Sequence, residues 1–102
     1  MKDITIAFDS SGKPFATPDP CEVNNGTKIT LQTAAGVDTP FDIDFQDESP
    51  AGPHADKHLS SKKEDSRQKV KLTADNAMAT YKYSIKANGI TVDPAIIIQR
   101  PQ

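Results

Sequence analysis

The 102-residue chain has room for one hydrophobic core of modest size, so we expect a single domain over residues 1–102. Its formal net charge is −2, with 12 Lys and Arg against 14 Asp and Glu. This balance argues against a nucleic-acid partner, because neutralising phosphates requires a clustered excess of basic residues. No apolar run approaches the roughly 18 to 20 residues that cross a bilayer, so we expect no membrane partner.

Cys21 is the only cysteine, which excludes an intramolecular disulfide. Stability must then come from packing, and a lone thiol is compatible with a reducing compartment. The residues Met1–Asp3 lead directly into an alternating apolar segment, without a charged and then apolar leader. We therefore expect a cytoplasmic location if this N-terminus is native, and a periplasmic or secreted location if a signal peptide has been removed.

Apolar and polar residues alternate with a period of two along five segments, which is the pattern of strands with one buried face. The apolar positions are Ile4, Ile6 and Phe8; Ile29 and Leu31; Phe41, Ile43 and Phe45; Val70 and Leu72; and Tyr81, Tyr83 and Ile85. The polar residues between them suit the solvent face of an antiparallel sheet. Two more short strands are expected at residues 21–23 and 95–99, which gives about seven strands.

Turn-forming residues separate these segments. Asn24-Asn25-Gly26 and Asn88-Gly89 favour tight turns that need positive φ. Pro14, Pro18 and Pro20 confine the chain between the first two strands to an extended, edge-like course. Short strands at this spacing predict an all-β fold of two stacked sheets.

Residues 47–66 depart from the strand pattern and contain Pro50, Pro53 and the charged run 62–65. Loops of this length are uncommon inside compact domains and often carry function. We expect one long loop here, with a short helical turn around Leu59.

The order of these segments resembles the cupredoxins, the small Greek-key sandwiches that include plastocyanin. Cys21–Ile29 is similar to the strand, turn and strand of that family. Pro40–Phe45 resembles the stretch that reads Pro, His, Asn, apolar, apolar, Phe in copper-binding members, and Thr80–Ile85 is similar to the strand that leads into the copper cysteine. Ala95–Gln99 looks like the closing strand. The resemblance implies a Greek-key β-sandwich of about seven strands.

The resemblance also implies where the copper ligands should lie, and each of these positions holds another residue. Phe41 stands in the place of the first His, Ile85 in the place of the thiolate, and Asn88 near the place of the second His, while no Met follows Met78. A type 1 copper site needs two imidazoles and a thiolate with a weak axial ligand. Neither a phenyl ring nor an aliphatic chain donates a lone pair. We therefore expect no cofactor, no metal and no copper function, and we expect Phe41 and Ile85 to be packed into the end of the sandwich.

His54 and His58 are the only histidines and lie four residues apart. On a helix this spacing would place both imidazoles on one face, as some metal sites require. The alternative function is therefore a metal-handling or electron-transfer protein with an unconventional copper or zinc site built from these histidines and Cys21. The neighbouring Pro53 favours solvated loop histidines instead, and a buried cysteine usually behaves as a small apolar residue. Met78 is expected to pack.

Acidic residues gather on and around one predicted strand, at Asp38, Asp42, Asp44, Asp47 and Glu48. They suggest either a site for a hard cation or an acidic docking surface. The simpler interpretation, which we favour, is a solvated strand face.

Motifs for catalysis are missing: there is no Gly-rich phosphate loop, no Ser-His-Asp set with informative spacing and no paired-carboxylate motif. The sequence therefore predicts a non-catalytic, metal-free cupredoxin-like domain with a structural or protein-binding role. Residues 47–66 and the acidic strand are the expected contact surfaces for an unidentified protein partner. Lys69, Lys71, Lys82 and Lys86 should discourage uncontrolled pairing of sheet edges, and the oligomeric state stays open.

Overall fold

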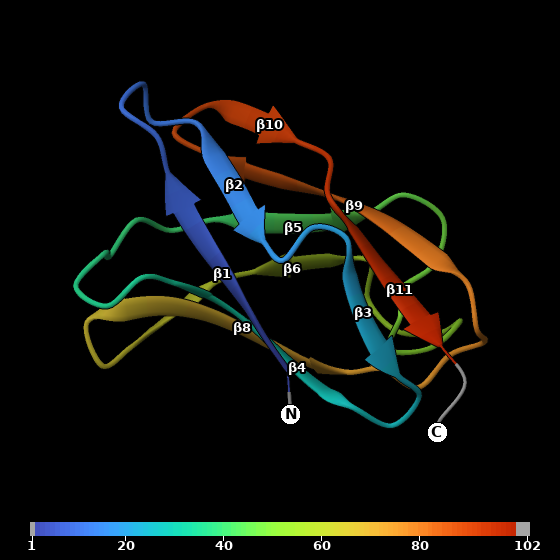
Figure 1. Ribbon diagram of the computed structural model, residues 1–102. Coiled ribbons are helices and arrows are strands. Elements are labelled where there is room, and N and C mark those ends of the chain that lie inside the picture. Colours follow the sequence, from blue (N-terminus) through green and yellow to red (C-terminus); the bar gives the residue numbers. More distant parts are fainter. Residues whose placement is uncertain (1, 100–102) are drawn as a thin grey trace.

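The structure, a computed structural model, describes residues 2–99 and contains eleven strands and no helix within that range. Two mixed sheets pack face to face, as in a β-sandwich (Figure 1). The predicted all-β class is therefore confirmed. Because this range has no helix at all, it has none long and apolar enough to cross a membrane.

The first sheet has the strand order β2-β1-β4-β8-β7. Its members are β1 (Lys2–Phe8), β2 (Pro14–Thr17), β4 (Lys28–Thr33), β7 (Lys62–Glu64) and β8 (Arg67–Thr73). β1 and β4 run parallel, and the other neighbours are antiparallel. The proline-rich segment after β1 forms the edge strand β2, as its composition predicted, because proline lacks the N–H that an interior strand must donate.

The second sheet has the order β3-β11-β9-β5-β6, and β10 also pairs with β9. Its members are β3 (Cys21–Asn24), β5 (Asp42–Phe45), β6 (His58–Ser60), β9 (Thr80–Ala87), β10 (Ile90–Val92) and β11 (Ala95–Gln99). β3 and β11 are parallel. The expectation of purely antiparallel sheets is therefore wrong at one pair in each sheet. Period-two alternation reports which face is buried and carries no information on strand direction.

The core lies between the two sheets and is built from the apolar positions that the alternation selected. The buried hydrophobic residues are Ile4, Ile6, Cys21, Val23, Ile29, Leu31, Phe41, Ile43, Phe45, Val70, Ala74, Tyr81, Tyr83, Ile85, Ala87, Ile96 and Ile98. Phe8 and Leu72 are partly buried against them. Burial of the alternate residues fixes the register, since a slip by one residue would turn every core side chain outward.

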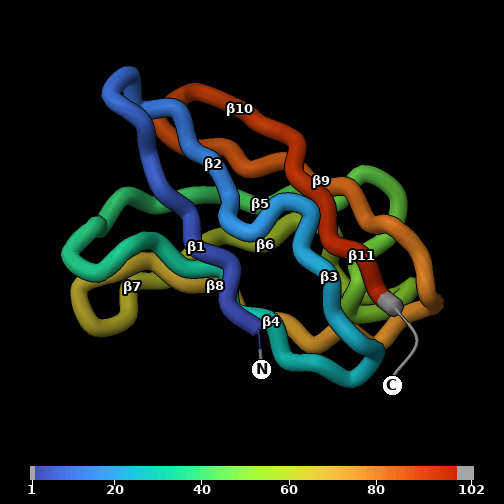
Figure 2. Tube along the Cα trace, in the orientation of Figure 1, coloured from blue at the N-terminus to red at the C-terminus, as the bar shows by residue number. Residues whose placement is uncertain are grey.

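The expected long loop with a helical turn around Leu59 is wrong. Leu59 lies in β6, which pairs with β5 so that His58 lies opposite Asp44 and Ser60 opposite Asp42. After Ser61 the chain crosses to the other sheet as β7 (Figure 2). The extra strands β2, β6, β7 and β10 raise the count above the predicted seven, because strands of three or four residues show too little alternation to detect.

Two tight turns set the hairpins at the ends of the sheets. Asn88 and Gly89 have φ of 54° and 74° and join β9 to β10, as the Asn-Gly pair predicted. Asp65 and Ser66 have φ of 51° and 68° and join β7 to β8. Positive φ at both central residues belongs to the turn type whose twist matches antiparallel strands. The second turn contains no glycine, so no residue type in it predicted a turn with positive φ.

Candidate functional site

The corner of the sandwich formed by Phe41 and Ile85 is filled with hydrocarbon. Phe41 is 2 % exposed just before β5, and Ile85 is fully buried in the neighbouring strand β9. The Phe41 N–H donates to Ser61 Oγ at 2.9 Å, and the Ser61 N–H donates to the Phe41 carbonyl at 2.9 Å. These bonds hold the ring in place, so the predicted packing of both residues is confirmed.

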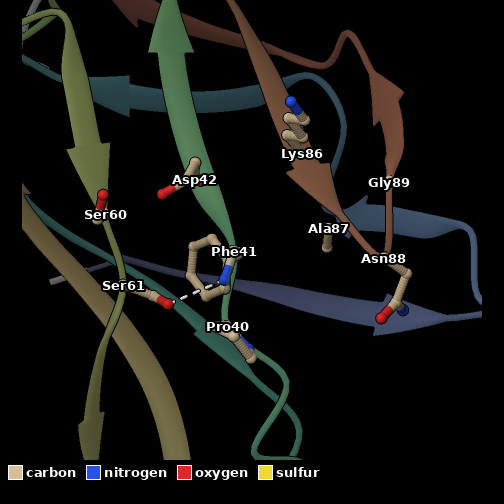
Figure 3. Close-up of a pocket in the computed structure, with 9 residues that line it drawn as sticks. All are labelled: Pro40, Phe41, Asp42, Ser60, Ser61, Lys86, Ala87, Asn88 and Gly89. Carbon is tan, nitrogen blue, oxygen red and sulfur yellow. Dashed lines mark hydrogen bonds between the residues drawn. The ribbon is translucent and has the colours of Figure 1, made fainter.

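A cavity of about 270 Å³ opens above this corner (Figure 3). Its walls come from β5, β6 and the β9–β10 turn, and include Asp42, Ser60, Lys86 and Asn88. Figure 3 shows Ser60 and Ser61 on one side of Phe41 and Asn88 on the other. The Asn88 Nδ2 donates to the Gly12 carbonyl at 3.1 Å. Asn88 thus links two turns.

A polar network lies behind the corner and involves Asp38. Ser61 Oγ donates to Gln68 Oε1 at 2.9 Å, and Gln68 Nε2 donates to Asp38 Oδ1 at 2.7 Å. The Gln68 N–H donates to Thr33 Oγ1 at 2.9 Å, and Lys63 Nζ lies 3.0 Å from Asp38 Oδ2. The hydrogen bonds from Gln68 and Lys63 lower the pKa of Asp38. Asp38 therefore anchors a loop and is not part of one acidic cluster.

The other acidic residues divide between a strand face and the loop after it. Asp42 and Asp44 alternate with buried residues along β5 and face solvent. Asp47 and Glu48 lie beyond the end of β5, beside a second cavity of about 260 Å³. In residues 2–99, no group of three or more His, Cys, Asp and Glu side chains is arranged to hold a metal ion. The strand geometry instead places Asp42 opposite Lys86 of β9 and Asp44 opposite His58 of β6, all on the outer face of the second sheet.

On this face His58 contacts Asp44 and Ser60, an arrangement that the sequence pattern did not predict. His58 Nδ1 lies 2.6 Å from Asp44 Oδ1, and His58 Nε2 lies 3.4 Å from Ser60 Oγ. The hydrogen bond and the negative charge of Asp44 raise the pKa of His58. No local pattern could reveal this set, because Asp44 and His58 meet only through the pairing of β5 with β6.

The order Asp, His, Ser is that of a nucleophilic relay, in which the imidazole must accept the serine proton. Here the imidazole is stabilised in its protonated form, and the Ser60 contact is long for an O–H···N bond. The His58 and Asp44 side chains are 60 % and 54 % exposed, so water competes for every bond. Chemically, the set is best suited to tying the edge strand β6 to β5 and to holding a proton.

The residues of the alternative metal site are widely separated. Cys21 begins β3 and His58 begins β6, and these strands form opposite edges of the second sheet. His54 lies in the exposed turn before β6, and no helix brings it above His58. Burial raises the pKa of the Cys21 thiol, which disfavours the thiolate that binds metals or attacks substrates.

Met78 was expected to pack and instead lies 53 % exposed after β8. It follows the half-buried Asn76 and the exposed Ala77. Hydrogen bonds from Asn76 Nδ2 to the Ser49 carbonyl at 2.9 Å and to Glu48 Oε2 at 3.4 Å hold this segment. Met78 belongs to no alternating segment, so no strand period carries its side chain inward.

Compared with known proteins, the chain matches no family model and no curated protein. The functional argument therefore depends on the residues and their arrangement alone.

Proposed function

We propose that this chain is a non-catalytic, metal-free domain of the cupredoxin-like, Greek-key type, and that it acts by binding another protein. The observation that carries this proposal is the filled corner, where Phe41 and Ile85 are 2 % and 0 % exposed. Hydrocarbon side chains at these positions supply no ligand, and each contributes about 1.5 to 3 kcal/mol of burial to the fold.

The strand connections support the Greek-key assignment. β1 pairs with β4, although β2 and β3 lie between them in the chain, and β3 pairs with the last strand, β11. Such pairing of strands joined by long connections is what distinguishes a Greek key from a simple series of hairpins. Sandwiches of this kind present their loops and outer faces for recognition on a rigid frame.

The outer face of β5 is the surface best suited to a protein partner. β5 is held between β6 and β9, which fixes the backbone that carries its solvent-facing carboxylates: Asp42 lies opposite Lys86, and Asp44 contacts His58. The loop from Asp47 to Lys57 adjoins the same strand and extends this surface. Fixed carboxylates of this kind favour a partner with a basic contact patch.

The metal-free part of the proposal is tested by elemental analysis of protein purified without chelator and then titrated with copper(II) and zinc. We expect substoichiometric metal and no thiolate-to-copper band near ~600 nm, since such a band needs a ligating thiolate. Stoichiometric metal that is lost in His54→Gln and His58→Gln would support the metal-handling alternative and overturn the proposal.

The binding part is tested by placing the photo-crosslinking residue p-benzoylphenylalanine at Asp44 and, as a matched control, at Asp3. Asp3 is also an exposed aspartate, but it lies on β1 in the other sheet. After irradiation in the native cell, we expect a discrete protein adduct from Asp44 and none from Asp3. Equal adducts from both positions, or measurable turnover in a hydrolase screen that disappears in Ser60→Ala, would contradict the proposal.

A further inference from the structure

A second binding surface, beyond the proposed function, lies at the far edge of the first sheet. We infer that this edge accepts an extended acidic peptide as an added β-strand. The feature is defined by the backbone of Lys71 and Thr73 in β8, and we call it the edge slot. It arises because β7 is shorter than β8.

The hydrogen-bond pattern of β8 determines which backbone groups face this edge. The Ala74 N–H donates to the Thr27 carbonyl of the neighbouring chain segment at 2.8 Å. In an antiparallel pair, alternate residues bond to the same neighbour. Leu72 therefore bonds to β4 as Ala74 does, and the N–H and C=O groups of Lys71 and Thr73 point away from β4.

The groups on the outer side of β8 are occupied above and below the slot. β7 covers β8 only from Arg67 to Lys69, the last pair being Lys62 with Lys69. At the other end, the Asp75 N–H donates to the Pro50 carbonyl at 2.9 Å. Within residues 2–99, β4 pairs with the inner side of β8 here, and no strand pairs with its outer side between these two points. The slot therefore offers two donors and two acceptors in the spacing of one short strand.

A groove beside the slot provides room for side chains. A cavity of about 290 Å³ lies between β6 and β8, with Leu59 and Val70 among its lining residues. In an added strand, alternate side chains would point inward to this apolar floor and outward to solvent. The groove therefore favours a peptide with aliphatic residues at every second position.

The charges at the rim of the groove determine which residues the peptide should carry at the positions that face solvent. Lys62, Lys69 and Lys71 all line the groove, and Lys62 lies directly opposite Lys69. Like charges in directly opposed positions are destabilising. The only acidic lining residue is Glu64, whose Oε1 lies 3.2 Å from Lys71 Nζ. The groove therefore has three ammonium groups and one carboxylate. Carboxylates of a bound peptide would neutralise the remaining positive charge.

The same lysines disfavour pairing with a second copy of the chain. A copy that added its own β8 would bring Lys69 and Lys71 against these charges. Lysines on an exposed edge commonly prevent such association. The occupant is therefore an acidic extended segment of another protein, recognised by strand addition.

The test uses a capped peptide of alternating Glu and Val, with a matched peptide of alternating Lys and Val. A third peptide carries the Glu and Val sequence with N-methyl groups on alternate amides, which block strand pairing and leave the charge unchanged. Binding is followed by amide chemical shifts and hydrogen exchange of the full chain. We expect the Glu and Val peptide alone to bind, and the amides of Lys71 and Thr73 to shift and to exchange more slowly.

Charge reversal provides the protein-side control. Lys71→Glu should weaken binding of the Glu and Val peptide about tenfold or more, because it replaces attraction with repulsion at the slot. Lys82→Glu, on the other sheet, should leave affinity within about twofold. Both variants are first checked for an unchanged unfolding transition, and the N-methylated peptide tests strand pairing without altering the protein.

Four results would each overturn the inference. The N-methylated peptide or the Lys and Val peptide binds as tightly as the Glu and Val peptide, the Glu and Val peptide does not bind, or it shifts only the amides of β5 and its loop. These results are separable from the proposed function. A partner captured from Asp44 would still be captured if the slot bound nothing, and slot binding would persist if Asp44 captured no partner.

Discussion

Phe41 is the residue on which the end of the sandwich depends. Its ring is buried, and its backbone N–H and C=O both bond to Ser61. Phe41→Ala should lower the free energy of unfolding by about 3 to 5 kcal/mol, because a large cavity is left in the core. Phe15→Ala is the matched control, since Phe15 is 46 % exposed and should lose less than about 1 kcal/mol. Urea denaturation measures both, and equal losses would show that the corner is not closely packed.

Tyr83 buries a hydroxyl that has no hydrogen-bond partner among residues 2–99. Burying a hydroxyl without a partner costs the free energy of removing it from water, and Phe does not incur this cost. Tyr83→Phe should therefore be neutral or stabilising by about 1 kcal/mol. Tyr81→Phe provides the contrast, because the Tyr81 hydroxyl donates to the Ala77 carbonyl at 2.6 Å and its loss should cost about 1 kcal/mol. Thermal unfolding at neutral pH compares the two, and a clear loss in Tyr83→Phe would reveal a bound water or other partner.

The pairing of His58 with Asp44 predicts a pH dependence of stability. Because Asp44 raises the pKa of His58 in the folded state, folding favours the protonated imidazole. The stabilisation is complete below the ordinary value of 6.5 and disappears as pH rises through the raised pKa. Asp44→Asn should lower the pKa of His58 in an NMR titration and reduce this dependence. An unchanged titration curve in Asp44→Asn would contradict the role of the carboxylate.

At the scale of elements, the hairpin of β7 and β8 has an unusual turn. Asp65 and Ser66 both adopt positive φ without glycine, a conformation that costs L-residues roughly 1 kcal/mol or more. Ser66→Gly should therefore stabilise the protein by about 0.5 to 1 kcal/mol. Thr30→Gly, inside β4, should destabilise it by a similar amount, since glycine weakens a strand interior. Chemical denaturation measures the pair, and destabilisation by Ser66→Gly would argue against the turn geometry.

The elements also show how much the sequence could predict. All seven predicted strands are present, because each has two or more alternating apolar residues that the core requires. β7 has the sequence Lys62-Lys63-Glu64 and contains no apolar residue, so it exists only through its pairing with β8. Burial of Phe41 and Ile85 followed from residue type alone. The contact between Asp44 and His58 depended on the register of two distant segments, which no local pattern contains.

At the scale of the whole molecule, the outward positions of the two sheets differ in charge. β7 and β8 present Lys62, Lys69 and Lys71, whereas β5 presents Asp42 and Asp44 next to the exposed lysines of β9, with Lys86 opposite Asp42. The net charge of −2 conceals a mainly basic strip on one sheet and a face of mixed charge on the other. A domain with two such surfaces can engage two different partners, and added salt should weaken both interactions.

The position of β11 inside its sheet constrains how the protein can be made. β11 is the neighbour of both β3 and β9, yet it is the last strand of the described chain. In a nascent polypeptide that has left the ribosome only as far as Pro94, β3 and β9 both lack the neighbouring strand that β11 provides. The second sheet therefore cannot be completed at that point. Non-local pairings of this kind slow folding and expose chains to aggregation during synthesis. Formation of the complete sheet must consequently await the synthesis of β11.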